Sequence, residues 1–201
     1  MNRALAENIV ACLSFSGEKS IQFENLRRFS SRDWKRTLSW LDASGLALYF
    51  LQEIDNHNAR AVIQSEALVC LDKHLASNRK RVVQLADEIA NINQRFDQAH
   101  VKYAVIKGFS LVPLFCSDIS LRAQADIDYL INEASREVAK QALVEAGYKL
   151  TEVGSVESKF WKPSMRIATR SDGSYDVLTA AGVELHTAIW ACELVHVPCA
   201  E

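Results

Sequence analysis

Two aspartates, Asp126 and Asp128, are the residues whose type and spacing most directly suggest chemistry in this chain. If the segment 125–131 is a β-strand, side chains alternate between its faces, so both carboxylates point to one side, roughly 7 Å apart along the strand. Two like charges on one face are costly unless a cation lies near them, and carboxylate oxygens are the ligands that Mg²⁺ prefers. The pair therefore predicts a metal site, and the alternative is a solvated strand end.

A phosphate-binding turn is predicted upstream of the aspartates, at Lys107-Gly108. Glycine allows the backbone to approach a phosphate closely, and the N–H groups at the start of a following helix would donate to phosphate oxygens. Lys107 would add a charge and Ser110 a hydroxyl group. Arg122 has a planar guanidinium that suits a phosphate or a carboxylate, and its alternative role is an ion pair with Asp126 alone.

Three pieces of the sequence, in the order VIKG, RAQADIDYLI and EAGY, resemble a known family. They resemble the nucleotidyltransferases of the DNA polymerase β-like superfamily, in the branch whose pattern reads KG, R-x-x-x-D-x-D and later GY. The resemblance covers residues 33–190 and includes a later carboxylate-x-histidine piece at Glu184 and His186. The superfamily more often has Gly-Gly or Gly-Ser in the turn, whereas here the serine follows one place later, at Ser110.

The resemblance implies an α/β (α+β) fold, in which a polymerase-β-like nucleotidyltransferase core with a small mixed sheet follows an N-terminal helical region. It also implies an enzyme that transfers a nucleoside monophosphate from an NTP to an acceptor hydroxyl, with Mg²⁺ or alternatively Mn²⁺ as cofactor. Two metal ions held by shared carboxylates would activate the attacking oxygen and stabilise the leaving one. The residues that match these roles are Asp126, Asp128 and Glu184 for catalysis and metal binding, and Lys107, Gly108, Ser110 and Arg122 for nucleotide binding.

A third carboxylate is needed where a metal activates the acceptor, and Asp176 and Glu184 compete for this role. Asp176 follows Gly173-Ser174 in a hairpin-like stretch, where aspartate is common for turn reasons alone. Glu184 interrupts an apolar-flanked run in which alternation puts it on one face together with His186. Because an acidic residue in a half-buried strand needs a partner, we predict that Glu184 is the third carboxylate. His186 would orient it or contact phosphate, or else be a histidine of the core.

The acceptor cannot be read from the sequence, and a small-molecule hydroxyl, a protein side chain and an RNA end all stay open. Two alternative functions also stay open: a toxin-type nucleotidyltransferase that modifies tRNA, and a catalytically silent module that binds an NTP or a partner. The net charge of −2 gives no overall attraction to nucleic acid, although a local basic patch would still bind it. The oligomeric state is equally open.

The composition, with 49% hydrophobic and 24% charged residues, is close to globular averages and argues against long disorder and against a membrane protein. The chain shows neither an apolar run of membrane-spanning length nor a signal-peptide pattern. Its five cysteines are scattered without C-x-x-C spacing, which favours reduced cysteines over zinc ligands or disulfides. We therefore predict a cytoplasmic protein that does not associate with membranes.

Residues 1–100 are predicted to form the N-terminal helical region and residues 101–201 the nucleotidyltransferase core, because the hydrophobic period changes near His100. Within the first part, residues 58–100 lack glycine and proline and form one long helix or two, broken near Ser77-Asn78. In the core we expect strands at 103–106, 126–131, 148–153, 159–162, 165–169, 175–178 and 183–189, and helices at 110–115 and 133–146, the latter ended by Gly147.

Overall fold

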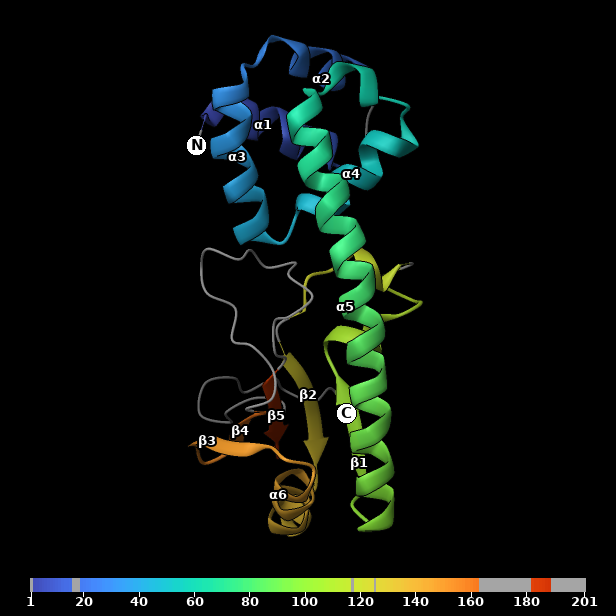
Figure 1. The fold of residues 1–201 in the computed structure, drawn as a ribbon, viewed down its shortest axis with the longest axis vertical. Coiled ribbons are helices and arrows are strands. Elements are labelled where there is room, and N and C mark those ends of the chain that lie inside the picture. The colour runs from blue at the N-terminus through green and yellow to red at the C-terminus, as the bar shows by residue number, and fades with distance from the viewer. Residues whose placement is uncertain (1, 16–18, 117, 125, 163–181, 189–201) are drawn as a thin grey trace, which may run out of the picture. The chain divides into compact units, whose positions relative to one another are not determined.

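The computed structural model describes residues 2–15, 19–116, 118–124, 126–162 and 182–188. The protein has an α+β fold, with helices in its N-terminal part and a five-stranded mixed sheet further along the chain (Figure 1). The predicted fold class is therefore confirmed. The strands expected at 165–169 and 175–178, together with Asp176, lie outside the described residues.

The N-terminal part consists of helices, as predicted. They are α1 (Arg3–Cys12), α2 (Ser20–Asn25), α3 (Ser31–Ser44), α4 (Ala47–Asn56) and α5 (Ser65–Gln98), with 3₁₀ turns at Leu26–Arg28 and Arg60–Val62. Helix α3 shows why the boundaries could be predicted. It begins with a capping box between Ser30 and Asp33 and ends at Gly45, whose φ of +70° is the left-handed conformation that glycine adopts easily.

Helix α5 is a single helix of 34 residues and has no break at Ser77-Asn78. A mid-helix asparagine often competes for nearby backbone groups and weakens a helix. Here the Asn78 side chain is fully buried, and its Nδ2 donates to the carbonyl oxygens of Ser120 (2.6 Å) and Arg122 (3.0 Å). Because the NH2 group of the side chain bonds to tertiary partners, the helix continues through Asn78.

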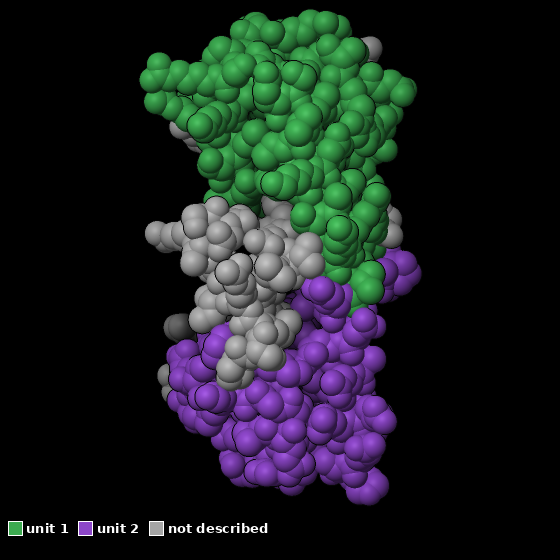
Figure 2. All heavy atoms as spheres, in the orientation of Figure 1, with its two compact units in different colours: residues 1–83, 116–123, 168–179 green, residues 84–115, 124–167, 180–201 purple. Residues whose placement is uncertain are grey.

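The chain forms two compact units (Figure 2). Of the described residues, the first unit contains those up to Val83 and the segment from Cys116 to Ala123, and the second contains Gln84–Phe115 and those from Gln124 onward. The boundary in the N-terminal half thus falls inside α5. The division into a helical region 1–100 and a catalytic core 101–201 remains our proposal for the functional domains.

The sheet lies in the second unit and has the strand order β1-β2-β5-β4-β3. Its strands are β1 (Tyr103–Ile106), β2 (Asp126–Ile131), β3 (Lys149–Val153), β4 (Glu157–Trp161) and β5 (Gly182–His186). Strand β2 pairs in parallel with β5, and the other pairs are antiparallel. Helix α6 (Arg136–Glu145) connects β2 to β3, and Gly147 follows it with a φ of +91°, in agreement with the predicted helix end.

The short helix predicted at 110–115 is wrong, because the structure has only a 3₁₀ turn at Gly108–Leu111 there. A proline restricts the residue before it to extended conformations, and Val112, which precedes Pro113, has φ −90° and ψ 140°. The helical conformation therefore stops at Leu111. A second 3₁₀ turn, Ile119–Leu121, belongs to the first unit.

Alternation along the two central strands determines which side chains reach the core of the second unit. Ile127, Tyr129 and Ile131 of β2 are buried, as are Val183 and Leu185 of β5. They form one cluster with the C-terminal half of α5 and with α6 through Leu85, Ile92, Phe96, Ala139 and Leu143. The residues between these positions, which include Asp128 of β2 and Glu184 of β5, consequently lie on the opposite face of the sheet.

Among the described residues, none of the helices combines the length and the apolar character that crossing a bilayer would require.

Candidate active site

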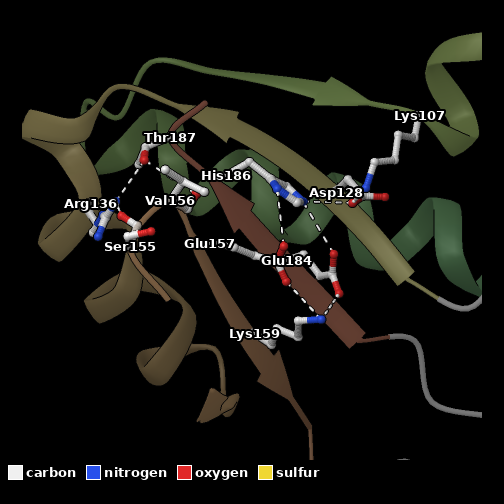
Figure 3. A network of polar contacts seen from close by, with 10 residues as sticks. All are labelled: Lys107, Asp128, Arg136, Ser155, Val156, Glu157, Lys159, Glu184, His186 and Thr187. Atoms are coloured by element: carbon white, nitrogen blue, oxygen red, sulfur yellow. Dashed lines mark hydrogen bonds and ion pairs between the residues drawn. The ribbon is translucent and has the colours of Figure 1, made fainter. Parts of the chain in front are cut away.

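The parallel pairing of β2 with β5 brings Asp128 and Glu184 together. The register sets Asp128 opposite Glu184 and Asp126 opposite Gly182. Since both acidic side chains point away from the helix-covered face, they meet on one side of the sheet, where Figure 3 shows them next to His186. Alternation in each segment predicted the face on which Asp128 and Glu184 lie, and the adjacency of β2 and β5 brings the two side chains together.

Asp128 is almost entirely buried, with a side-chain exposure of 3%, and two nitrogen atoms lie within hydrogen-bonding distance of it. Lys107 donates through Nζ to Asp128 Oδ1 at 2.6 Å, and His186 Nε2 lies 2.9 Å from the same oxygen. The hydrogen bond to Asp128 is the main cause that raises the pKa of the Lys107 ammonium above its ordinary value. The buried negative charge therefore has partners, as its burial requires.

Asp128, Glu184 and His186 could together hold a metal ion. Each offers one ligand atom, and the three atoms lie within 4.8 Å of one another. Two carboxylates suit Mg²⁺, and an added imidazole is compatible with Mn²⁺. The sequence prediction grouped Asp126 with Asp128 and Glu184, whereas the structure groups His186 with the last two. Asp126 is partly buried beside this group, and its role as a ligand remains a prediction.

Two charged side chains of β4, Lys159 and Glu157, lie close to Glu184 and His186. Lys159 stands opposite Glu184 in the strand register and contacts Glu184 Oε1 at 3.3 Å and Glu157 Oε1 at 2.9 Å. Glu157 Oε2 in turn lies 3.9 Å from His186 Nδ1. The sequence motifs include neither Lys159 nor Glu157, although their spacing of two residues in β4 (ESKFW) places both on the same face of the strand.

The Lys107-Gly108 turn has an unusual backbone conformation, with φ of +54° at Lys107 and +34° at Gly108. A Cβ atom on Gly108 would lie 2.6 Å from Oε1 of Gln124, so a larger residue in the turn would have to displace the end of that side chain. Ser110 closes the turn, because both its N–H (2.8 Å) and its hydroxyl group (2.6 Å) donate to the Lys107 carbonyl. Contacts of Gly108 and Ser110 with phosphate remain predictions.

Replacing Gly108 with alanine should therefore displace the turn. We expect Gly108→Ala to lower the free energy of unfolding by about 1 kcal/mol, since an L-residue is strained at positive φ. It should also weaken nucleotide binding by about tenfold, because Lys107 would move with the backbone. Denaturant unfolding and calorimetric titration with ATP would measure the two effects. Gly154→Ala is the control, because Gly154 does not have a positive φ and, among the described residues, an added Cβ atom would come no closer than 3.4 Å to the Glu157 carbonyl. An equal loss in both variants would contradict this reasoning.

A cavity of about 520 Å³ adjoins the charged group in the second unit. Its walls include Lys107 and Ser110 on one side and Val156 and Glu157 on the other, and His186 also lines it. The cavity therefore gives a ligand access to the turn and to the imidazole at the same time.

Arg122, which we predicted to bind nucleotide, belongs to the first unit. Its carbonyl accepts the hydrogen bond from Asn78, and its Nε is buried without a hydrogen-bond partner among the described residues. Its assignment to the nucleotide remains a prediction.

Comparison with known proteins identifies the family. A family model described as an uncharacterised nucleotidyltransferase matches residues 30–198, which is most of the chain and includes every residue of the site described above. No curated protein and no solved structure matches the chain significantly. The protein therefore belongs to this nucleotidyltransferase family and is an enzyme of the nucleotidyl-transferring class.

Proposed function

We propose that the protein transfers a nucleoside monophosphate from an NTP to the hydroxyl group of an acceptor, and that it uses Mg²⁺ or Mn²⁺. The observation that supports this most is the pairing of Asp128 with Glu184 on adjacent parallel strands, within reach of a lysine and beside a cavity. Family membership supports nucleotidyl transfer in general. The choice of metal, nucleotide and acceptor is our proposal.

The donor set fits a hard divalent cation. Asp128 and Glu184 each offer carboxylate oxygens, and His186 Nε2 lies 2.9 and 3.4 Å from one oxygen of each. A bound ion would supply charge stabilisation at the α-phosphate and the leaving pyrophosphate. Asp126, on the same face of β2, would complete the coordination as a further carboxylate.

The chain's own residues would perform the remaining tasks. Lys107 would neutralise the triphosphate, and the N–H groups of the Gly108 turn would donate to its oxygens. Glu184 would orient or deprotonate the acceptor hydroxyl group. Lys159 would hold Glu184 in place, because its ammonium group contacts the carboxylates of both Glu184 and Glu157.

A labelling screen would test this proposal. The protein is incubated with Mg²⁺ and each of the four NTPs, labelled at the α-phosphate, together with cell extract that has been fractionated into small molecules, RNA and protein. We expect label from one or more NTPs to appear in one fraction, and the fraction identifies the class of acceptor. Label in tRNA would favour the toxin-type activity. If no fraction is labelled while ATP or another NTP raises the melting temperature, the protein is a silent nucleotide-binding module.

A further inference from the structure

Two nitrogen donors converge on a single oxygen of the buried carboxylate. Lys107 Nζ (2.6 Å) and His186 Nε2 (2.9 Å) both contact Asp128 Oδ1 (Figure 3). Because an ammonium group already neutralises Asp128, a divalent cation at this carboxylate would lie next to a positive charge. Two cations so close together repel each other strongly in a poorly solvated site. The arrangement of donors therefore requires a rearrangement before a metal can bind.

Of the two donors, Lys107 is the one that can leave. Its side chain is 56% exposed and is a flexible chain of four carbons, whereas the His186 side chain is 10% exposed and is fixed on the central strand β5. Lys107 also lines the adjoining cavity, so its ammonium group can turn toward that space without a change in the sheet. The short turn that Ser110 closes would hold its backbone in position during this movement.

We propose that Lys107 is an exchangeable counter-ion, which neutralises Asp128 in the metal-free enzyme and moves into the cavity to bind the triphosphate when a divalent cation takes its place. This inference rests on the function proposed above. It implies that the Lys107 ammonium has two alternative partners, Asp128 and phosphate. Without a metal, the buried Asp128 carboxylate then keeps a counter-charge. Metal binding in turn frees the Lys107 ammonium for the nucleotide.

The affinity for Mn²⁺ alone, in the absence of nucleotide, is the first test. Lys107→Met removes the competing ammonium and keeps the length of the side chain. We expect it to bind Mn²⁺ about tenfold more tightly than the wild type, which is the size of one charge-assisted hydrogen bond. Electron paramagnetic resonance of free Mn²⁺ would measure both affinities. Lys140→Met is the control, because it removes an equal charge from the second unit at an ion pair with Glu137, outside the group that could hold a metal. An equal gain in that variant would reduce the effect to general electrostatics and overturn the exchange.

Chemical reactivity of Lys107 in the wild-type protein is the second test. A short pulse of acetic anhydride followed by peptide mass spectrometry reports how free each lysine amine is. We expect saturation with Mn²⁺ to increase acetylation of Lys107 several-fold, because the amine leaves Asp128, and ATP added afterwards should suppress it again. Lys149, an exposed lysine on β3, serves as the internal reference and should not change.

The outcomes separate this inference from the proposed function. One outcome is that the wild type binds Mn²⁺ and Asp128→Asn does not, while Mn²⁺ leaves the acetylation of Lys107 unchanged. This result would overturn the counter-ion exchange but would still support the metal site. A wild-type protein that binds no Mn²⁺ in either the presence or absence of ATP would instead overturn the metal-dependent function itself.

Discussion

Asp128→Asn should reduce nucleotidyl transfer by roughly a thousandfold or more, the range seen when a charge-stabilising group is removed from a reaction centre. The amide keeps the shape of the side chain but loses the charge that would hold a divalent cation. Turnover of α-labelled NTP under saturating Mg²⁺ would measure the loss. Glu152→Gln, on the exposed strand β3, is a matched acid-to-amide control and should retain wild-type turnover. Substantial Mg²⁺-dependent turnover in Asp128→Asn would contradict its assignment.

The same variant should also be less stable. Relief of the repulsion between two like charges on one strand face would by itself leave the free energy of unfolding unchanged or slightly higher. The structure changes that expectation, because Asp128 is buried and bonded to both Lys107 and His186. Loss of the charge weakens both contacts, although Lys107 can turn to solvent. We expect the free energy of unfolding to fall by about 1–2 kcal/mol, measured by urea denaturation without metal.

Glu184→Gln is expected to remove most of the transfer activity while nucleotide binding persists. Glu184 lies opposite Asp128 in the sheet and is the acidic group closest to where an acceptor oxygen would be activated in our proposal. Its loss should lower kcat by roughly a hundredfold or more and change the dissociation constant of ATP by less than about threefold. Single-turnover kinetics and calorimetry would separate the two quantities.

A matched variant is available on the neighbouring strand. Glu157→Gln removes another carboxylate that contacts Lys159, but Glu157 lies 3.9 Å from His186 and is not part of the group that could hold a metal. It should therefore have a much smaller effect on kcat. If Glu184→Gln instead weakens ATP binding as much as it lowers kcat, Glu184 contributes to nucleotide binding and not to the chemical step.

Elements with strong local signals could be predicted from the sequence. Strands β1 and β2 have the predicted bounds, because short runs of β-branched and aromatic residues end at a glycine or at Asn132. Gly147 follows its helix in a left-handed conformation, as predicted. The choice of Glu184 rested on alternation in β5, and the structure gives that strand the same alternation, with Val183 and Leu185 buried in the core.

The features that could not be predicted are those that depend on contacts between segments far apart in the sequence. The sequence contains nothing that sets Asp128, and not Asp126, opposite Glu184, because the register of two parallel strands is decided by the packing of the whole sheet. Likewise, α5 remains unbroken at Asn78 because of carbonyl groups more than forty residues away. The contact of Lys107 with Asp128 is also long-range, and the positive φ at Lys107 that accompanies it is not a conformation that a lysine would be expected to adopt.

The central position of β5 also determines when the enzyme can become active during its synthesis. Strands β1 and β2 leave the ribosome first, and β3 and β4 follow as a hairpin, but β5 lies between β2 and β4 in the finished sheet. Until it is inserted, the two pairs of strands each expose an unpaired edge and share no hydrogen bonds with each other. Because β5 also carries Glu184 and His186, completion of the sheet also completes the group of residues that could hold a metal. With the function proposed above, a nascent chain would not consume NTP before its fold is finished, and its folding should be limited by this late, long-range insertion.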